Sequence, residues 1–325
     1  KTNPRAELDL PDFRSFGNSF LGSIYAEIKP LSWLTYRIAP SFDISNGRDK
    51  NWLIKYDLGV RSNNRASLAE NYYEYIGLSL ENQIIANLSF GKHTFTGTLV
   101  HQIRKNDSRN ISGTGYGFNY ESLDVLSMSN EADRVLGGGV GSFRMLSYLG
   151  RIIYDYDGKY LITASLRRDG VSRFAPSRRF GTFPSFSAAW KVNEDFLQNV
   201  TQISLLKLRF GWGATGNSNI GDFQYDDFLD NTSAFAPVFG NPQKLVPGMY
   251  IFYSFANPAI KWESAYMTNF GLDFGLLNNQ LQGSIEYYIK NQEDLLVRVP
   301  ISMVFGRSGD QSETWANAGK LQNRG

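Results

Sequence analysis

The sequence predicts an all-β fold, a transmembrane antiparallel up-and-down β-barrel, and two observations carry this prediction. First, the predicted strands keep their charged residues on one side. In Trp33–Ser45, Arg37 and Asp43 alternate with apolar residues, and successive side chains of a strand lie on opposite faces. Second, the connections between strands are alternately short and long. A barrel that crosses a membrane has one dry face, short turns at one rim and long loops at the other.

The predicted strands follow one another along nearly the whole chain. They cover residues 19–28, 33–45, 74–90, 93–104, 144–156, 159–169, 180–192, 203–213, 262–276, 281–290 and 315–325. The division into an uncharged and a polar face recurs at 146–156, 160–167, 270–276 and 281–290. About a dozen residues per strand, tilted by about 40°, span a hydrocarbon layer of about 25–30 Å.

The connections between these strands fall into two classes. Short turns, in which Gly, Asn and Asp tolerate positive φ, are predicted at Lys29–Ser32, Gly91–Lys92, Asp157–Gly158 and Leu277–Gln280, with a longer compact connection at Asn193–Gln202. Long loops, predicted to be extracellular, lie at about 46–73, 105–143, 170–179, 214–261 and 291–314. In Trp52–Arg61, apolar and polar residues also alternate. We assign it to a hairpin arm of the first long loop, because an extra barrel strand would move Gly91–Lys92 to the wrong rim.

Composition excludes several classes of protein. The 325 residues carry a net charge of +2 and no cysteine, which argues against a nucleic-acid partner and excludes disulfides and thiolate metal sites. No run of about eighteen apolar residues is present to form a spanning helix. The 18 tyrosines and 23 phenylalanines fit either aromatic girdles at a membrane interface or a Tyr-rich sandwich. We expect residues 1–325 to be part of one barrel domain, cut from a longer protein.

Catalytic and metal-binding signatures are weak, and we predict no catalytic residue, no metal site and no cofactor. The two histidines are His93, in a predicted turn, and His101, in a predicted strand, and no Gly-x-Ser-x-Gly elbow accompanies them. An outer-membrane hydrolase that pairs His101 with a serine is one alternative. Four acidic residues of one long loop offer oxygen ligands for calcium, although a solvated loop is the simpler interpretation. They are Asp222, Asp226, Asp227 and Asp230.

Several motifs identify a family by their order and spacing. They are Tyr160–Gly170, Phe180–Trp190, Leu206–Arg209, Gly213–Asn217, Lys261–Glu263, Thr268–Gly275 and Asn278–Tyr288. This series resembles the SusC/RagA branch of TonB-dependent outer-membrane transporters of the Bacteroidetes. The resemblance covers most of residues 75–325, and residues 1–74 match loosely.

The resemblance implies a 22-stranded barrel in the outer membrane, of which this chain would form about half. It implies uptake of oligosaccharides or oligopeptides with energy supplied through TonB. It also implies a SusD-like surface lipoprotein as a lid, and a plug domain and a TonB-binding segment that precede the barrel and are not in this chain. The competing class is a soluble β-rich carbohydrate-binding module, whose uncharged strand faces would pack on each other.

Two sets of residues are candidates for contacts. Aromatic residues of the long loops are expected either to contact substrate or the lid, or to pack among themselves. They are Tyr116, Phe118, Tyr120, Phe223, Tyr225 and Phe228. Charged residues on the polar side of the strands are expected to contact the lumen or the plug. They are Arg151, Arg167, Arg209, Asp273 and Glu286. Their mixed signs select neither an anionic nor a cationic cargo.

Overall fold

The computed structural model describes residues 10–59, 61–120, 122–198, 200–226, 229–230, 238–239, 244–245, 250–251, 256–302 and 313–325. Antiparallel strands account for most of them. The short helices among these residues are η1 (Leu126–Met128), η2 (Glu131–Asp133) and α2 (Asn193–Phe196). Within the described ranges, no helix has the length and apolarity needed to cross a membrane.

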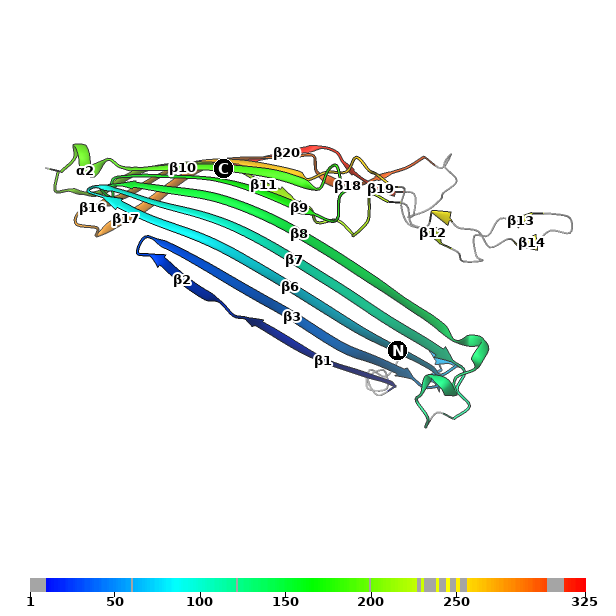
Figure 1. Cartoon of the computed structure of the whole chain (residues 1–325). Coiled ribbons are helices and arrows are strands. Elements are labelled where there is room, and N and C mark those ends of the chain that lie inside the picture. The colour runs from blue at the N-terminus through cyan, green and yellow to red at the C-terminus, as the bar shows by residue number, and fades with distance from the viewer. Residues whose placement is uncertain are drawn as a thin grey trace. The chain divides into compact units, whose positions relative to one another are not determined.

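Twelve strands form one sheet, and their order in the sheet follows their order in the chain (Figure 1). They are β1 (Pro11–Ser23), β2 (Ala26–Leu31), β3 (Leu34–Leu53), β6 (Ser67–Phe90), β7 (His93–Tyr116), β8 (Val135–Tyr156), β9 (Tyr160–Val171), β10 (Phe180–Lys191), β11 (Ile203–Asn217), β16 (Glu263–Leu276), β17 (Leu281–Glu293) and β20 (Lys320–Arg324). β1 and β2 pair with different parts of β3. This up-and-down order confirms the predicted fold class.

Shorter strands form hairpins outside this sheet. They are β4 (Tyr56–Asp57) with β5 (Ser62–Asn63), β12 (Leu229–Asp230) with β15 (Tyr250–Ile251), β13 (Val238–Phe239) with β14 (Lys244–Leu245), and β18 (Leu296–Pro300) with β19 (Glu313–Asn317).

The short turns at Gly91–Lys92, Asp157–Gly158 and Leu277–Gln280 lie where the sequence places them, whereas the turn predicted at Lys29–Ser32 lies at 32–33, because β2 continues to Leu31. Gly91 has φ 58° and Asp157 has φ 56°, and the run Leu277, Asn278 and Asn279 has φ of 53°, 55° and 64°. Gly and Asn reach this left-handed region at low cost, so these residues close two-residue and slightly longer hairpins between adjacent strands.

Several strands are longer than predicted. β3 continues to Leu53 and β6 begins at Ser67, which leaves 54–66 of the predicted loop 46–73. In the same way β7 continues to Tyr116 and β8 begins at Val135, inside the predicted loop 105–143. The added segments are polar on both faces or rich in glycine, so hydrophobic alternation cannot mark them. Trp52 is the next-to-last residue of β3, and of the predicted hairpin arm Trp52–Arg61 only Tyr56–Asp57 forms a hairpin strand.

The strands predicted at the two ends of the chain each differ from the structure. The predicted strand 19–28 is interrupted at Ile24–Tyr25, between β1 and β2. The predicted strand 315–325 is divided between β19, which pairs with β18, and β20, which pairs with β17. Gly319, with φ 86°, provides the left-handed residue that separates β19 from β20.

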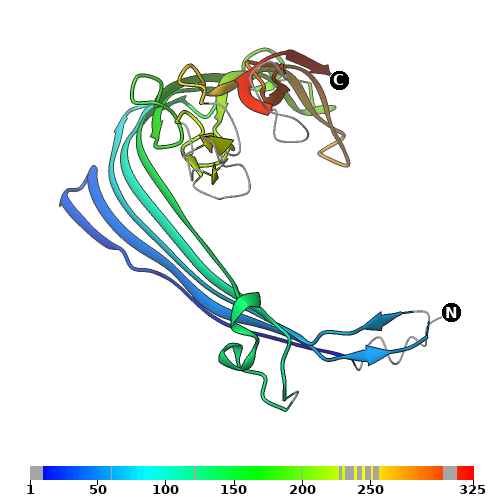
Figure 2. The same ribbon diagram turned by 90° about the vertical axis from the view of Figure 1, so that its right-hand side faces the viewer.

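The chain divides into two compact units. Unit 1 consists of residues 1–25, 39–80 and 104–144, and unit 2 of residues 26–38, 81–103 and 145–325. Unit 1 has a small core in which Phe118 packs edge-on against Trp52 with ring centroids 4.6 Å apart, beside Leu68 and Ala66. The segment with η1 and η2, green in Figure 2, lies at the ends of β7 and β8.

Unit 2 has a second small core beyond the ends of β9 and β10. Phe174 and Phe183 both contact the Trp262 ring, at centroid distances of 5.6 Å and 5.3 Å, and Trp262 donates its indole N–H to the Arg179 carbonyl. Outside this core, the side chains on the uncharged face of the strands are exposed or half-buried. Ile152 is 58% and Ile285 62% exposed, while Leu34 and Leu272 are half-buried. No second protein layer covers this apolar face among the described residues of unit 2.

Aromatic rings cross the apolar face near the short turns of unit 2. Phe95 lies 4.7 Å from Tyr154, and Tyr160 lies 6.1 Å from both Tyr156 and Trp190, measured between ring centroids. Amphipathic rings in one row at the end of an apolar face are typical of a membrane interface. The arrangement favours the girdle interpretation of the aromatic content.

Candidate functional site

The polar face of unit 2 is the candidate functional site. Register fixes which side chains share it: Ser165 of β9 lies opposite Ser185 of β10, which lies opposite Gly213 of β11. The neighbouring residues Leu166 and Pro184 point to the apolar face, because side chains alternate along each strand. The polar face therefore collects most of the charged residues of β8–β11, β16 and β17, with Arg168 as an exception on the apolar side.

One arginine connects three strands on this face. Arg209 donates through Nε and Nη2 to the two carboxylate oxygens of Asp273, at 2.9 and 2.8 Å. Its Nη2 also reaches Glu286 at 2.6 Å and Ser284 Oγ at 3.1 Å. Gly271 lies opposite Arg209, and a Cβ there would come within 2.8 Å of Arg209 Cζ. The glycine therefore leaves room for the guanidinium to lie across β16. The sequence predicted Arg209, Asp273 and Glu286 separately, and the structure brings them together.

A second pair lies on β9. Arg167 Nε donates to both carboxylate oxygens of Asp169, at 2.9 and 2.7 Å, and its Nη2 lies 3.4 Å from Ser147 Oγ. Asp169 is only 6% exposed, so its charge is matched within the same strand. Sequence analysis found Arg167 but missed Asp169 and Ser147. Arg151 is exposed and stands opposite Ser165, with no recorded partner among the described residues.

A hollow of about 620 Å³ opens on the polar face beside these charges. Its floor contains Gly211 and Gly213, and no atom lies within 4 Å of the position that a Cβ on Gly211 would take. Its rim carries Asn269, Thr215 and a serine pair, Ser165 and Ser185, whose hydroxyl oxygens are 2.6 Å apart. The lining offers neutral donors and acceptors together with the Arg167–Asp169 ion pair, and Arg151, opposite Ser165, has no recorded partner among the described residues. Such a surface suits hydrogen bonding to uncharged hydroxyl or amide groups.

The predicted loop aromatics have different environments. Phe118 is 1% exposed in the core of unit 1, where it packs against Trp52 and Leu68, so of the two expected roles it takes packing inside the protein. Tyr120 is 67% exposed, and Tyr116 lies under the Arg65 guanidinium at 5.3 Å. In unit 2, Phe223 is partly exposed at φ 60° and Tyr225 is half-buried. Phe228 lies outside the described residues.

The acidic residues that were candidates for a calcium site have other environments in the structure. Asp222 accepts a hydrogen bond from Arg173 Nε at 3.1 Å, which supplies its counter-charge. Asp227 lies outside the described residues, and of Asp230 only the backbone is described. Among the side chains that the structure describes, no group of three acidic or histidine residues could hold a metal ion.

His101 has neighbours that do not resemble a hydrolytic site. Its Nδ1 lies 3.5 Å from Asn82 Nδ2, and its ring lies 5.2 Å from the Tyr148 ring. Asn82 also accepts a hydrogen bond from Tyr36 Oη at 2.8 Å. Tyr148 belongs to the apolar face, so this small polar cluster lies on the side opposite to the hollow. Sequence analysis missed the cluster, because its members come from four strands.

Asp195, on α2, is the most strongly perturbed carboxylate, and sequence analysis also missed it. It accepts hydrogen bonds from Tyr160 Oη, from Trp190 Nε1 at 2.9 Å and from Lys159 Nζ at 3.0 Å. These bonds, with that from Tyr160 as the largest contribution, lower the pKa of Asp195 to about 2. The residue therefore ties α2 to the turn ends of β9 and β10.

Comparisons with known proteins agree on one family. The family model "TonB dependent receptor-like, beta-barrel" matches residues 6–325. The TonB-dependent receptor SusC of Bacteroides thetaiotaomicron is 39% identical over 99% of this chain, and the TonB-dependent receptor P39 of Formosa agariphila is 31% identical over all of it. The chain spans about 31% and 30% of the lengths of these two relatives.

Among solved structures, that of the RagAB peptide transporter superposes with a TM-score of 0.86 and 25% identity. The match covers 98% of this chain and 34% of the RagAB chain. Receptors of this kind are outer-membrane proteins of the Bacteroidetes, so the outer membrane is the location of this chain. The chain belongs to the TonB-dependent receptor β-barrel family, in its SusC/RagA branch.

Proposed function

We propose that this chain is part of the barrel wall of an active outer-membrane importer, in which TonB supplies the energy for uptake. One observation carries the proposal: the sheet of unit 2 has an uncovered apolar face, and its opposite face carries paired charges and a polar hollow. An apolar face of this kind suits lipid, and a polar face suits a water-filled interior. TonB itself would act on a plug in the N-terminal part of the full protein.

The cargo that fits the polar face is an uncharged or zwitterionic oligomer, an oligosaccharide or an oligopeptide. The related RagAB structure is that of a peptide transporter. The hollow includes hydroxyl, amide and glycine residues; the charge of Arg167 in its lining is matched by Asp169, and that of Arg209 nearby is matched by Asp273 and Glu286. A strongly charged cargo would find no free counter-charge at these pairs.

The long loops are the proposed seat of a SusD-like surface lipoprotein, and we place them on the extracellular side. Tyr120 is the best candidate for contact with such a lid, because its ring is exposed and lies close to the unit 1 core without belonging to it. Arg151, Arg167, Arg209, Asp273 and Glu286 remain candidates for contact with the lumen or the plug.

A pair of glycine variants tests the proposal in the full-length importer. Gly211 on the polar face and Gly97 on the apolar face both have no atom within 4 Å of the position that a Cβ would take, so a leucine fits sterically at either site. We expect Gly211→Leu to reduce uptake-dependent growth on the cognate oligomer and Gly97→Leu to leave it unchanged. Equal growth of both variants at equal surface expression would contradict a transport role for the hollow.

A further inference from the structure

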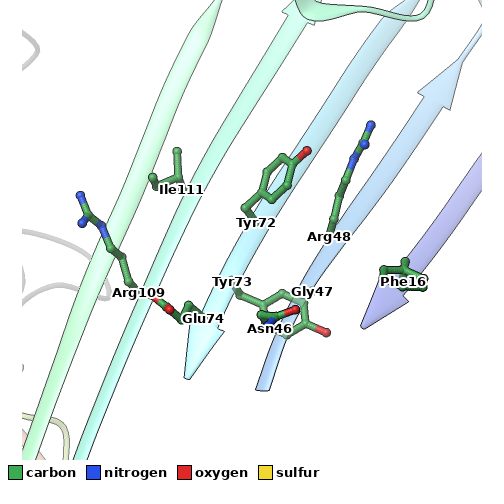
Figure 3. Close-up of a pocket in the computed structure, with 9 residues that line it drawn as sticks. All are labelled: Phe16, Asn46, Gly47, Arg48, Tyr72, Tyr73, Glu74, Arg109 and Ile111. Carbon is green, nitrogen blue, oxygen red and sulfur yellow. The ribbon is translucent and has the colours of Figure 1, made fainter. Parts of the chain in front are cut away.

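Exposed aromatic rings occur in both units, and their neighbours differ. In unit 1, Tyr72 lies under the Arg48 guanidinium at 5.6 Å, in a hollow that Arg109 also lines (Figure 3). The ring in unit 1 thus has a charged partner within its own unit. In unit 2, Phe196 of α2 is 72% exposed, and it packs edge-on against the Trp190 ring at 5.8 Å. An exposed apolar ring that extends an aromatic cluster indicates a surface for an apolar or interfacial partner.

Phe196 extends the row of rings near the short turns of unit 2. Trp190 stands opposite Tyr160 in the register of β9 and β10, and Tyr160 shares the apolar face with Leu166, because side chains alternate along β9. The ring centroids of Tyr156, Tyr160 and Trp190 follow at intervals of 6.1 Å, and that of Phe196 lies 5.8 Å beyond Trp190. The Phe196 ring of α2 therefore lies at the turn end of the apolar face (Figure 1).

Three hydrogen bonds to one carboxylate hold α2 against this face. Asp195, which precedes Phe196, accepts from Tyr160 Oη and from Trp190 Nε1, the latter at 2.9 Å. Lys159 Nζ donates a third hydrogen bond at 3.0 Å and supplies the counter-charge. A carboxylate beside lipid is costly unless it is paired and hydrogen-bonded. These three donors therefore allow Asp195 to lie next to an exposed ring at a membrane surface.

The two sides of α2 differ in chemistry. Asn193 ties the start of the helix to β11, because it donates to the Ser204 carbonyl at 3.3 Å and accepts from the Leu206 N–H at 3.1 Å. Residues two apart on a helix point in nearly opposite directions. The exposed Glu194 side chain is therefore on the side opposite to the exposed Phe196 ring. An aromatic ring on one side and a carboxylate on the other are typical of a segment that lies in a membrane interface.

We propose that α2 is a membrane-surface anchor, in which Phe196 inserts into the inner phospholipid leaflet and Asp195 holds the helix against Trp190. The partner is the boundary between headgroups and acyl chains, where aromatic rings are favoured. Lipid is the occupant because the ring continues the apolar face of the sheet, so the same layer that covers that face reaches Phe196. An anchor at this place keeps the turn ends of β9, β10 and β11 at a fixed depth.

The anchor rests on the proposed function in two respects. Lipid must cover the apolar face of unit 2, and the short turns must lie on the inner side of the membrane. It does not depend on the cargo, or on any contact between unit 1 and unit 2. A label on the apolar face itself therefore separates failure of the anchor from failure of the barrel wall.

Nitroxide spin labels in the full-length importer, reconstituted into phospholipid vesicles, test the proposal. The labelled variants are Phe196→Cys, Glu194→Cys and Ile152→Cys, each as a single cysteine; residues 1–325 contain none of their own. Oxygen, which concentrates in hydrocarbon, and a water-soluble nickel complex each speed the relaxation of an accessible label. We expect the oxygen-to-nickel ratio to be highest at Ile152, lowest at Glu194 and intermediate at Phe196. A ratio at Phe196 equal to that at Glu194, with Ile152 still in lipid, would overturn the anchor and leave the barrel wall intact.

Two further outcomes would also overturn the anchor. A label at Phe196 that neither reagent reaches would show that protein covers the ring, and a label at Ile152 relaxed mainly by nickel would remove the barrel wall as well.

Removing the carboxylate tests what holds α2. In the Phe196→Cys background, Asp195→Ala deletes the acceptor of three hydrogen bonds, so the label should move toward water and its oxygen-to-nickel ratio should fall to that at Glu194. Glu194→Ala in the same background is the matched control, because that side chain is exposed, and it should leave the ratio unchanged. Both are measured on protein that keeps its heat-modifiable gel mobility. An unchanged ratio in Asp195→Ala would overturn the holding role of Asp195.

Discussion

Unit 1 and unit 2 differ in how polar and apolar residues are distributed over the two faces of their strands. In unit 2 the strands keep most of their charges on one face, with exposed apolar side chains such as Ile152 on the other face and paired charges such as Arg209 and Asp273 on the polar one. In unit 1 charged residues lie on both faces of the outer part of β3, where Arg48, Asp49 and Lys50 follow one another. We infer that strict alternation of apolar and charged residues along a strand indicates that its two faces meet different solvents. Pairing of the backbone continues where both faces meet water.

Deleting a ring from the core of unit 1 should have the largest local effect. Phe118→Ala removes a side chain that is 1% exposed and contacts Trp52, and such truncations cost about 3–5 kcal/mol. We expect faster amide hydrogen exchange in residues 117–134, with the strands of unit 2 unchanged. Exchange that rises throughout both units would contradict the division into separate cores.

Charge on the apolar face should have the next largest effect. Ile152 and Ile153 are adjacent, but Ile152 lies on the apolar face opposite Ala164, and Ile153 lies on the polar face opposite Thr163. An arginine facing the middle of the bilayer costs about 2–4 kcal/mol. We expect Ile152→Arg to lower the yield of folded protein, measured by heat-modifiable gel mobility in lipid vesicles. Ile153→Arg is the control, and an equal loss in both variants would show that lipid does not cover the Ile152 side.

The arginine network of unit 2 should respond in a graded way. Asp273 accepts two hydrogen bonds from Arg209 and one from Ser284, whereas Glu286 accepts one from Arg209. Losing charged hydrogen bonds of partly buried groups costs about 1–3 kcal/mol. Asp273→Asn should therefore reduce the free energy of unfolding more than Glu286→Gln, as measured by denaturant titration in vesicles. The exposed pair Lys320–Glu293 is the control, for which truncation should cost less than about 1 kcal/mol.

Asp195 should give the smallest effect, visible mainly through its pH dependence. Its pKa is lowered to about 2 in the folded state, below the value of about 3.9 for a free aspartate. The stabilisation is therefore fully present above about pH 4 and is lost as the pH falls through 2. Melting temperatures of the wild type and Asp195→Asn should differ at pH 7 and converge near pH 2. A difference that persists unchanged at pH 2 would assign the effect to packing.

The candidate site shows how far sequence reasoning reaches. Arg167, Arg209, Asp273 and Glu286 were found because each is a charge on the polar side of an alternating strand. Asp169, the Gly211 hollow and the Asp195 cluster were missed, because a partner two residues along a strand or on another strand leaves no local pattern. Phe118 was expected either to contact a partner or to pack, because an aromatic residue in a loop has the same sequence signature whether it is exposed or buried.

The sequence by itself determined the class of fold, the positions of the turns and the identity of the two strand faces. Each of these depends on local chemistry: alternation of period two, and residues that accept positive φ. Only the tertiary structure decided where the strands end, which charges meet and which loop rings are buried. These depend on register and on hydrogen bonds between strands, and such bonds form equally well between polar residues that carry no periodic signal.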